Sequence, residues 1–258
     1  MAAVEEKEAR EQVAVDLLAA GVRRGGAVLV HSSLKSMGHV PGGPETVIRG
    51  LLGALGPEGT LLMPALSYVT VKAEQPVFDV LKTPSCVGAI PEYFRTRPGT
   101  IRSVHPTHSV CGVGARAAHF LGDHQRDNTP AGENSPYRRL RDECGQILML
   151  GCGLWPNTSM HGVEELVEPP YLFAGEVTYE IILLDGRRMD YTCRRHDFAG
   201  YRQRYDRVAG ILSAPALQVG MVLEATVHVL DCATLWEQAE AALRAEPLYF
   251  VEAVGPTP

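Results

Sequence analysis

The 258-residue sequence predicts an α/β fold in which helices flank a central mixed sheet. Between residues 27 and 66 a strand, a helix and a second strand follow one another, which indicates a right-handed parallel crossover. Further along, Asp185-Gly186 separates two strand-like runs and is the strongest hairpin signal in the chain, so antiparallel strands are expected there. Because no repeat, low-complexity segment or linker divides the chain, we expect a single domain over residues 1–258.

The first half of the chain contains the elements of the parallel crossover. Apolar residues spaced among charges predict a helix over 4–20, which ends at Gly21. Residues 67–85 have no clear period and predict a loop over the carboxyl ends of the strands, where ligands of α/β folds usually bind. The other elements expected in this half are strands over 27–30 and 60–66 and helices over 45–55 and 87–95.

The second half alternates between helices and strands. Ser135 and Pro136 are typical of the N-cap and the first position of a helix over 137–144. The other elements expected here are helices over 116–124, 161–166, 198–213 and 233–245, and strands over 146–151, 176–184, 187–193 and 221–230.

Composition and charge argue against several classes of function. The net charge of −6 and the pI near 5.9 disfavour a nucleic-acid-binding face, which needs clustered basic residues. The charged N-terminal stretch has no signal-peptide core, and no run approaches the roughly 20 apolar residues of a membrane span. Six scattered cysteines without a CxxC pair are typical of reduced thiols. We therefore expect a cytoplasmic protein without a nucleic-acid or membrane partner.

A histidine and a carboxylate stand three residues apart just after the apolar strand over 146–151. Thr158 or Ser159 is expected to cap the helix in which they lie. Positions i and i+3 share a face of a helix, so the Glu164 carboxylate can contact the His161 imidazole. Such a contact selects the tautomer of the ring and raises its basicity, as a general base near neutral pH requires. The spacing alone also fits a solvated or capping ion pair.

A polar loop containing several glycines joins the first strand to the next helix. It runs from His31 to Pro44, with Gly42-Gly43 just before the helix. Free backbone N–H groups at a helix N-terminus suit an anionic ligand. The loop matches neither the P-loop pattern nor GxGxxG, so an ordinary connection between strand and helix is the alternative.

Two histidines and several hydroxyl residues are concentrated between residues 102 and 114. His105 and His108 could join His161 as three nitrogen ligands of a metal ion, although no HExxH pattern links them. Ser109 could be considered as a hydrolase nucleophile, but it is not part of a GxSxG elbow. We expect no metal at the site, and a metal-dependent hydrolase is the less favoured alternative.

Five segments stand in register along the chain. They are His31-Ser32-Ser33-Leu34 with Gly38 and Gly42-Gly43; Leu55-Gly56-Pro57-Glu58-Gly59-Thr60-Leu61 with Met63-Pro64; Arg102-Ser103 with His105-Pro106-Thr107-His108-Ser109-Val110; Gly132-Glu133 with Ser135-Pro136; and Asn157-Thr158-Ser159 with His161 and Glu164. In order and spacing these segments resemble the aminoglycoside 3-N-acetyltransferase family, or antibiotic N-acetyltransferase family. The resemblance is strong over about residues 10–170 and looser beyond them.

The resemblance implies a fold of the antibiotic N-acetyltransferase type, which is not the GNAT fold. It implies a transferase that uses acetyl-CoA as cosubstrate and acetylates the 3-amino group of a 2-deoxystreptamine aminoglycoside, an activity of antibiotic resistance. His161 then corresponds to the general base and Glu164 to the carboxylate that orients it. Another small amine is the alternative acceptor, and a protein that binds acetyl-CoA without turnover is a further alternative.

The resemblance also implies where the cosubstrate binds. The cofactor-binding loop corresponds to the stretch from Ser32 to Gly43, and residues 107–110 correspond to the segment beside the thioester. The expected cofactor-binding residues are His31, Ser32, Ser33, Leu34, Lys35, Gly42, Gly43, Thr107, His108, Ser109 and Val110. By charge alone, the candidates for contact with the adenosine 3′-phosphate are Lys35, Arg102 and Arg116.

The chemistry of acetyl transfer adds two expectations. The oxyanion that forms needs hydrogen-bond donors, and the hydroxyl of Thr107 or Ser109 is a candidate, so Thr107 is expected to be catalytic. A cationic acceptor calls for carboxylates around its pocket, although loop acids are often only solvated. The expected substrate-binding residues are Tyr68, Asp79, Asp127 and Glu133. The protein is expected to be a monomer or a homodimer.

Overall fold

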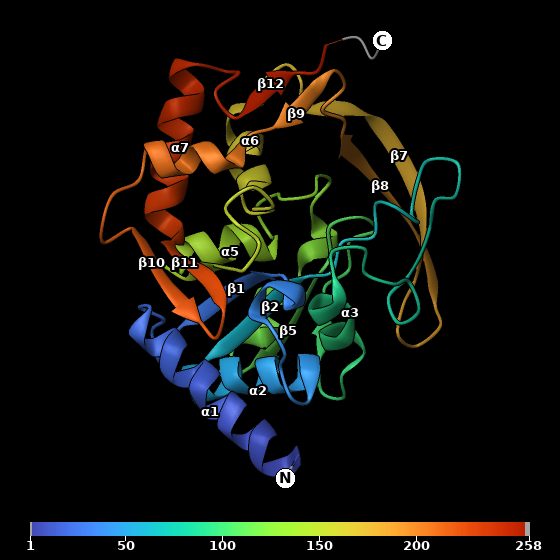
Figure 1. Ribbon diagram of the computed structural model, residues 1–258. Coiled ribbons are helices and arrows are strands. Elements are labelled where there is room, and N and C mark those ends of the chain that lie inside the picture. Colours follow the sequence, from blue (N-terminus) through green and yellow to red (C-terminus); the bar gives the residue numbers. More distant parts are fainter. Residues whose placement is uncertain (1, 256–258) are drawn as a thin grey trace.

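A computed structural model describes residues 2–255 and shows a seven-stranded mixed sheet with helices on both faces (Figure 1). The strand order is β10-β11-β6-β1-β2-β5-β4. The three central strands, β6 (Gln146–Leu150), β1 (Ala27–Ser32) and β2 (Thr60–Pro64), are parallel. The outer strands pair antiparallel and are β10 (Leu217–Val222), β11 (Ala225–Asp231), β5 (Val110–Gly114) and β4 (Ile101–Arg102). The predicted α/β class with a central mixed sheet is confirmed.

Helices cover the sheet in two layers, each with its own hydrophobic core. The first layer consists of α1 (Ala2–Ala19), α2 (Gly43–Leu55) and α3 (Ala89–Thr96). The second consists of α4 (Ala117–Leu121), α5 (Pro136–Asp142), α6 (Met160–Val167) and α7 (Cys232–Ala245). Alternate residues of a strand point to opposite faces, so Val28 of β1 packs in the first core and Leu29 in the second. This burial on both faces explains why the central strands read as apolar runs.

A long hairpin lies beside the central sheet, at the right of Figure 1. It consists of β7 (Phe173–Ile182) and β8 (Arg188–His196), and its turn contains the predicted Asp185-Gly186. Within the segment predicted to be a loop, β3 (Val77–Asp79) adds a short parallel strand to β7. The hairpin brings His196, its last residue, toward the central strands.

The helix predicted over 198–213 is wrong. This segment contains β9 (Tyr201–Gln203), which pairs antiparallel with β12 (Val251–Ala253), and then the 3-10 helix η3 (Tyr205–Gly210). The Arg204 guanidinium forms ion pairs with Asp206 and with Glu252 of β12. The partner that turns this segment into a strand comes from some 50 residues further along the chain, so local periodicity could not indicate it.

The single strand predicted over 221–230 is confirmed over 225–230 and wrong at its start, where the chain reverses between β10 and β11. Leu223 has a positive φ of 51°, and its N–H donates to the Asp16 carboxylate of α1 at 2.9 Å. The reversal makes β10 and β11 an antiparallel hairpin at one edge of the central sheet.

Two further 3-10 helices are short: η1 (Leu34–Met37) and η2 (His124–Arg126). All six cysteines are free, in keeping with the expected reduced thiols. None of the helices within residues 2–255 combines the length and the hydropathy that a membrane span requires.

Candidate active site

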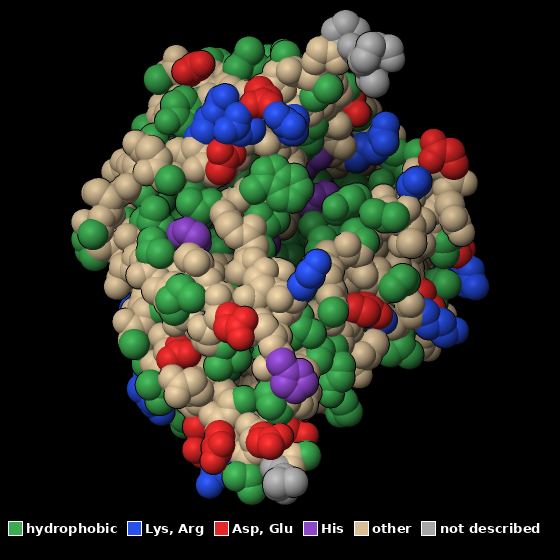
Figure 2. All heavy atoms as spheres, in the orientation of Figure 1, with side chains coloured by type: hydrophobic (Ala, Val, Ile, Leu, Met, Phe, Trp, Pro, Cys, Tyr) green, Lys and Arg blue, Asp and Glu red, His purple; other side chains and the backbone are tan. Residues whose placement is uncertain are grey.

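A pocket of about 590 Å³ opens at the edge of the sheet where the parallel strands end. Figure 2 shows it as a hollow in which histidine side chains are visible. Ser32 at the end of β1 and Cys152 just after β6 lie in its wall. Because β5 runs antiparallel, His108, which precedes it, reaches the same edge. The lining residues are Ser32, Leu66, Tyr68, Cys86, Val87, His108, Cys152, Trp155, Pro156, Asn157, Thr158, His161, His196, Phe198, Gln203 and Tyr205.

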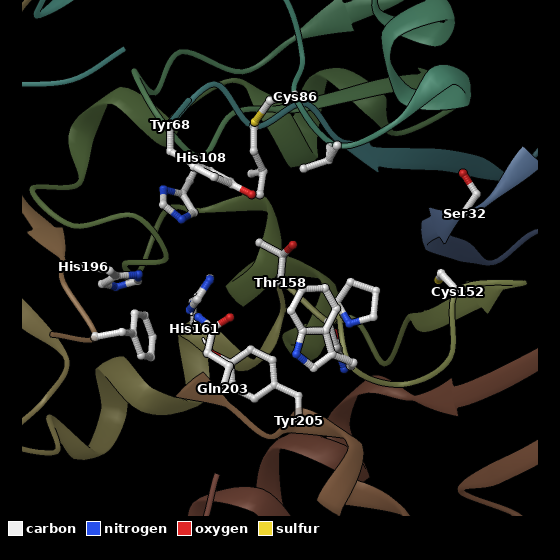
Figure 3. A pocket seen from close by; sticks show the side chains of 16 residues that line it. Ser32, Tyr68, Cys86, His108, Cys152, Thr158, His161, His196, Gln203 and Tyr205 are labelled. Carbon is white, nitrogen blue, oxygen red and sulfur yellow. Dashed lines mark hydrogen bonds between the residues drawn. The ribbon is translucent and has the colours of Figure 1, made fainter. Parts of the chain in front are cut away.

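His161 lies in the first turn of α6 and is backed by a buried carboxylate. Its Nδ1 is 3.2 Å from Oε2 of Glu164, as the i, i+3 spacing predicts, and Glu164 is fully buried. A carboxylate only accepts hydrogen bonds, so Nδ1 carries the proton and Nε2 has a free lone pair. His161 belongs to the pocket wall (Figure 3). The arrangement has the donor and acceptor pattern of a general base held by an orienting acid.

Two tyrosines hold the Glu164 carboxylate in place. The Tyr205 hydroxyl donates to Oε2 at 2.7 Å and also lies 3.1 Å from His161 Nδ1, while the Tyr171 hydroxyl donates to Oε1 at 3.0 Å. Burial and the neighbouring carboxylate raise the pKa of Tyr205 well above its usual value, so this hydroxyl remains a donor. Both oxygens of Glu164 therefore have partners, which satisfies the buried charge.

A second histidine and carboxylate pair lies next to the first. His196 Nε2 is 2.9 Å from Oε1 of Glu165, the residue that follows Glu164 in α6. The Thr129 hydroxyl donates to Glu165 at 2.6 Å and the Ala131 N–H at 2.8 Å. Burial raises the pKa of Glu165 to about 7. Burial and the nearby His161 lower the pKa of His196 well below its usual value, so its ring is neutral.

His108 completes a cluster of three histidines. Its ring centroid is 5.3 Å from that of His161 and 5.4 Å from that of His196, and the latter two are 4.7 Å apart. His105, the other histidine of the sequence motif, instead stacks on His124 at 4.8 Å and accepts hydrogen bonds at Nδ1 from two backbone N–H groups. The three histidines of the alternative metal set, His105, His108 and His161, are therefore not brought together, because His105 is held in the protein interior.

The residues predicted to bind the cosubstrate are distributed unevenly around the pocket. Ser32 and His108 line it, whereas His31 lies behind the wall, where its Nε2 accepts the Thr158 N–H at 3.0 Å. Burial, with the nearby His161, lowers the pKa of His31 to about 3, so its ring is neutral and can accept this bond. The residues that are not part of the wall are Ser33, Leu34, Lys35, Gly42, Gly43, Thr107, Ser109 and Val110.

Ser109 and Thr107 have their hydroxyls engaged within the fold. The Ser109 hydroxyl, one of the two candidates for assisting the oxyanion, donates to the Ala65 carbonyl and accepts from Arg102, both at 2.9 Å. Arg102, one of the residues considered for the adenosine 3′-phosphate, donates to the backbone carbonyls of Val80, Thr83 and Ala65. The Thr107 hydroxyl is 2.8 Å from His108 Nδ1 and thus contacts a lining residue, not the pocket.

The acids predicted to bind the acceptor are not in this pocket. Asp79 accepts the backbone N–H groups of two residues that follow it, and Asp127 accepts three hydrogen bonds from Asn134. Glu133 lies on the loop, outside the pocket wall. Of the four predicted substrate-binding residues, only Tyr68 lines the pocket. The acidic side chains nearest to the pocket are instead Glu164 and Glu165, which contact two of its lining histidines.

Sequence reasoning missed Glu165, His196 and Tyr205. Glu165 stands beside Glu164 in the same motif and could have been considered with it, since consecutive helical positions reach different neighbours. No local signal singles out His196 at the end of a strand, and Tyr205 lies in the segment predicted to be a helix. His196 and Tyr205 reach the pocket only through long-range packing.

The glycine after His161 allows a tryptophan to pack closely on α6. A Cβ built on Gly162 would lie 2.0 Å from the ring of Trp236, which is almost fully buried and donates its indole N–H to Ser159 at 2.8 Å. Ser159 is the N-cap of α6, but its hydroxyl accepts from Trp236 and does not bond to the helix backbone. The close contact therefore positions the turn that carries His161.

We expect Gly162→Ala to lower the free energy of unfolding by about 1–3 kcal/mol, because the added methyl group overpacks the core against Trp236. Urea denaturation measures this change. Gly53→Ala in α2 is the matched control, since its Cβ would meet only Ala14 at 3.7 Å, and it should stabilise the protein by up to about 1 kcal/mol through helix propensity. Equal stability of the two variants would contradict the proposed packing.

The sequence and the fold of the chain are similar to those of known proteins. A family model described as aminoglycoside 3-N-acetyltransferase matches residues 29–244. Aminoglycoside N(3)-acetyltransferase VII of Streptomyces paromomycinus is 36% identical over 200 residues, which cover 70% of this chain and 68% of the relative. The solved structure described as AAC-IIIb binary with CoASH superposes with a TM-score of 0.79 at 28% identity, covering 96% of this chain and 98% of that one. The structure described as AAC-VIa bound to sisomicin superposes with a TM-score of 0.76 at 28% identity, covering 92% of this chain and 97% of that one.

Proposed function

Because the chain belongs to the aminoglycoside 3-N-acetyltransferase family, we propose that it transfers the acetyl group of acetyl-CoA to the 3-amino group of a 2-deoxystreptamine aminoglycoside. The observation that carries the proposal is His161, whose Nε2 is free in the pocket wall while Nδ1 is held by Glu164. Relatives solved with CoASH and with sisomicin support the two substrates. This activity is one of antibiotic resistance.

His161 has the task of removing a proton from the acceptor. An amine is bound as ammonium and cannot attack a thioester until it loses that proton, which His161 Nε2 accepts. The imidazolium that results is stabilised by Glu164, which already accepts the Nδ1–H. Attack by the neutral amine nitrogen on the thioester carbon forms the carbon–nitrogen bond, and the nitrogen loses its second proton to solvent. The carbon–sulfur bond then breaks to leave the amide, and the thiolate of CoA takes the first proton back from His161.

Two lining residues have a buried side-chain hydrogen-bond donor without a partner in the described chain. The Ser32 hydroxyl and the Asn157 side-chain N–H₂ are buried in the wall without a hydrogen-bond partner. Buried donors without partners are costly, so such groups are usually completed by a ligand. Ser32 ends β1, at the start of the loop assigned to the cosubstrate, and Asn157 precedes α6. We assign Ser32 to cosubstrate binding and Asn157 to the carbonyl oxygen on which negative charge develops.

The acceptor meets a pocket whose charge suits a polyamine. The described pocket wall contains neither a carboxylate nor a lysine or arginine. The Glu164 carboxylate lies directly behind His161, in buried surroundings where charge is poorly screened. Tyr68, Trp155 and Phe198 provide apolar surface for the rings of the substrate.

The test is release of free CoA thiol from acetyl-CoA across a panel of 2-deoxystreptamine aminoglycosides and simpler amines. We expect turnover with at least one aminoglycoside and a product that carries the acetyl group at its 3-amino nitrogen, as determined by NMR. Turnover only with unrelated amines would overturn the assigned acceptor but keep the reaction. Absence of turnover with every amine, although acetyl-CoA binds, would overturn the reaction itself.

A further inference from the structure

The three histidines of the pocket come from separate parts of the chain and face a common space (Figure 3). His108 precedes β5, His161 begins α6 and His196 ends β8. One ring nitrogen of each lies within 4.8 Å of the corresponding nitrogens of the other two, and this is the one such group of metal-ligating side chains within residues 2–255. General acid–base chemistry uses only one of these rings, so the convergence of all three is not explained by the proposed reaction.

Each of the three rings has one nitrogen held by a neighbouring oxygen. Thr107 holds Nδ1 of His108 at 2.8 Å, Glu164 holds Nδ1 of His161 at 3.2 Å, and Glu165 holds Nε2 of His196 at 2.9 Å. The other nitrogen of each ring is then available, and Nδ1 of His196 is buried without a partner. Histidine ligands of metal ions typically have this arrangement, in which a carboxylate, hydroxyl or carbonyl oxygen orients the ring from behind.

We propose that His108, His161 and His196 bind one divalent transition-metal ion of the Zn²⁺ type, and that the metal-bound form is inactive as a transferase. Three imidazoles suit zinc and its neighbours in the periodic table and do not suit Mg²⁺ or Ca²⁺, which prefer oxygen ligands. Binding occupies the Nε2 lone pair of His161, which is the lone pair that accepts the proton of the amine. The metal therefore competes with catalysis and does not assist it, and this inactivation rests on the proposed function.

The geometry requires only small movements. In a tetrahedral site with Zn–N bonds of about 2.0–2.1 Å, the ligand nitrogens are about 3.4 Å apart. In the structure, one ring nitrogen of each histidine lies within 4.8 Å of those of the other two. To reach the tetrahedral spacing, each nitrogen has to move by less than about 1 Å, which rotation of the side chains can supply. The pocket of about 590 Å³ leaves space for a water molecule as the fourth ligand.

The binding test uses Zn²⁺ in competition with a chromophoric chelator and Co²⁺ as a spectroscopic probe. We expect one ion per chain and the visible absorption band of tetrahedral Co²⁺. Cys86 and Cys152 also line the pocket but are not part of the proposed site. The spectrum should therefore have no charge-transfer band from a thiolate ligand. His196→Ala should weaken Zn²⁺ binding at least about tenfold. Glu165→Gln, which keeps all three ligands, should weaken it by about 10- to 100-fold through loss of the orienting carboxylate.

His119→Ala is the matched control, because His119 is an exposed surface histidine that pairs with Glu143 and is absent from the pocket wall. It should bind Zn²⁺ like the unaltered protein.

Transferase activity of the unaltered protein should fall in proportion to the bound Zn²⁺ and return when a chelator removes it. The proposal is overturned if His196→Ala and His108→Ala bind Zn²⁺ as tightly as the unaltered protein, if thiolate bands dominate the Co²⁺ spectrum, or if the zinc-loaded protein retains its turnover. If the metal-free, unaltered protein shows no acetyl transfer, only the proposed function is overturned, because zinc binding is measured independently.

Discussion

Replacement of His161 by glutamine is expected to lower kcat for acetyl transfer by about 10²- to 10⁴-fold, the usual contribution of a positioned general base. Glutamine approximates the size and polarity of the ring but cannot accept a proton near neutral pH. The buried Glu164 carboxylate keeps its bonds from Tyr205 and Tyr171 in this variant, so the fold should persist. Steady-state release of CoA thiol measures the change in kcat.

The control for this prediction is His119→Gln, on the surface, which should retain full activity. Binding of acetyl-CoA to the His161→Gln protein should stay nearly unchanged, because the ring acts on the acceptor amine. Turnover retained in the variant would show that another group removes the proton.

Replacement of Asn157 by aspartate is expected to lower kcat by about 10²- to 10³-fold, as the loss of one oxyanion donor does in other enzymes that catalyse acyl transfer. The Asn157 N–H₂ is buried in the pocket wall without a partner, whereas its Oδ1 accepts the Ser159 N–H at 3.2 Å. Aspartate retains that acceptor, removes the donor and places a negatively charged oxygen where charge develops. Loss of the donor and the added repulsion both act against the oxyanion.

The division between kcat and KM decides the role of Asn157. A group that acts on developing charge lowers kcat and kcat/KM alike, while a group that only binds the cosubstrate raises KM at constant kcat. Ser32→Ala is the companion variant, because its hydroxyl is the other unpartnered donor of the wall, and it should act mainly on KM for acetyl-CoA. An unchanged kcat in Asn157→Asp would remove this residue from the chemical step.

A predicted helix or strand is confirmed where neighbouring residues in the sequence are enough to specify it. The strands over 27–30, 60–66 and 146–151 are confirmed, because apolar runs between glycine-rich turns specify buried parallel strands within a few residues. The helix over 198–213 is wrong because β9 takes its hydrogen bonds from β12. Polar and apolar spacing in a segment cannot report a partner so distant in the sequence.

The sequence by itself determined the family, the acetyltransferase class, acetyl-CoA as cosubstrate, the α/β class and the contact of His161 with Glu164. These properties rest on motifs in register and on the i, i+3 geometry of one helical turn, which are short-range. Only the tertiary structure showed that His196 and Tyr205 line the pocket with His161, that Glu165 contacts His196, and that Asp79, Asp127 and Ser109 lie outside the pocket wall. The physical reason is that segments far apart in the sequence form the pocket together. The hairpin of β7 and β8, the β9–β12 pair and the antiparallel strand β5 place side chains at one edge of the sheet. The positions of these segments depend on long-range strand pairing and burial.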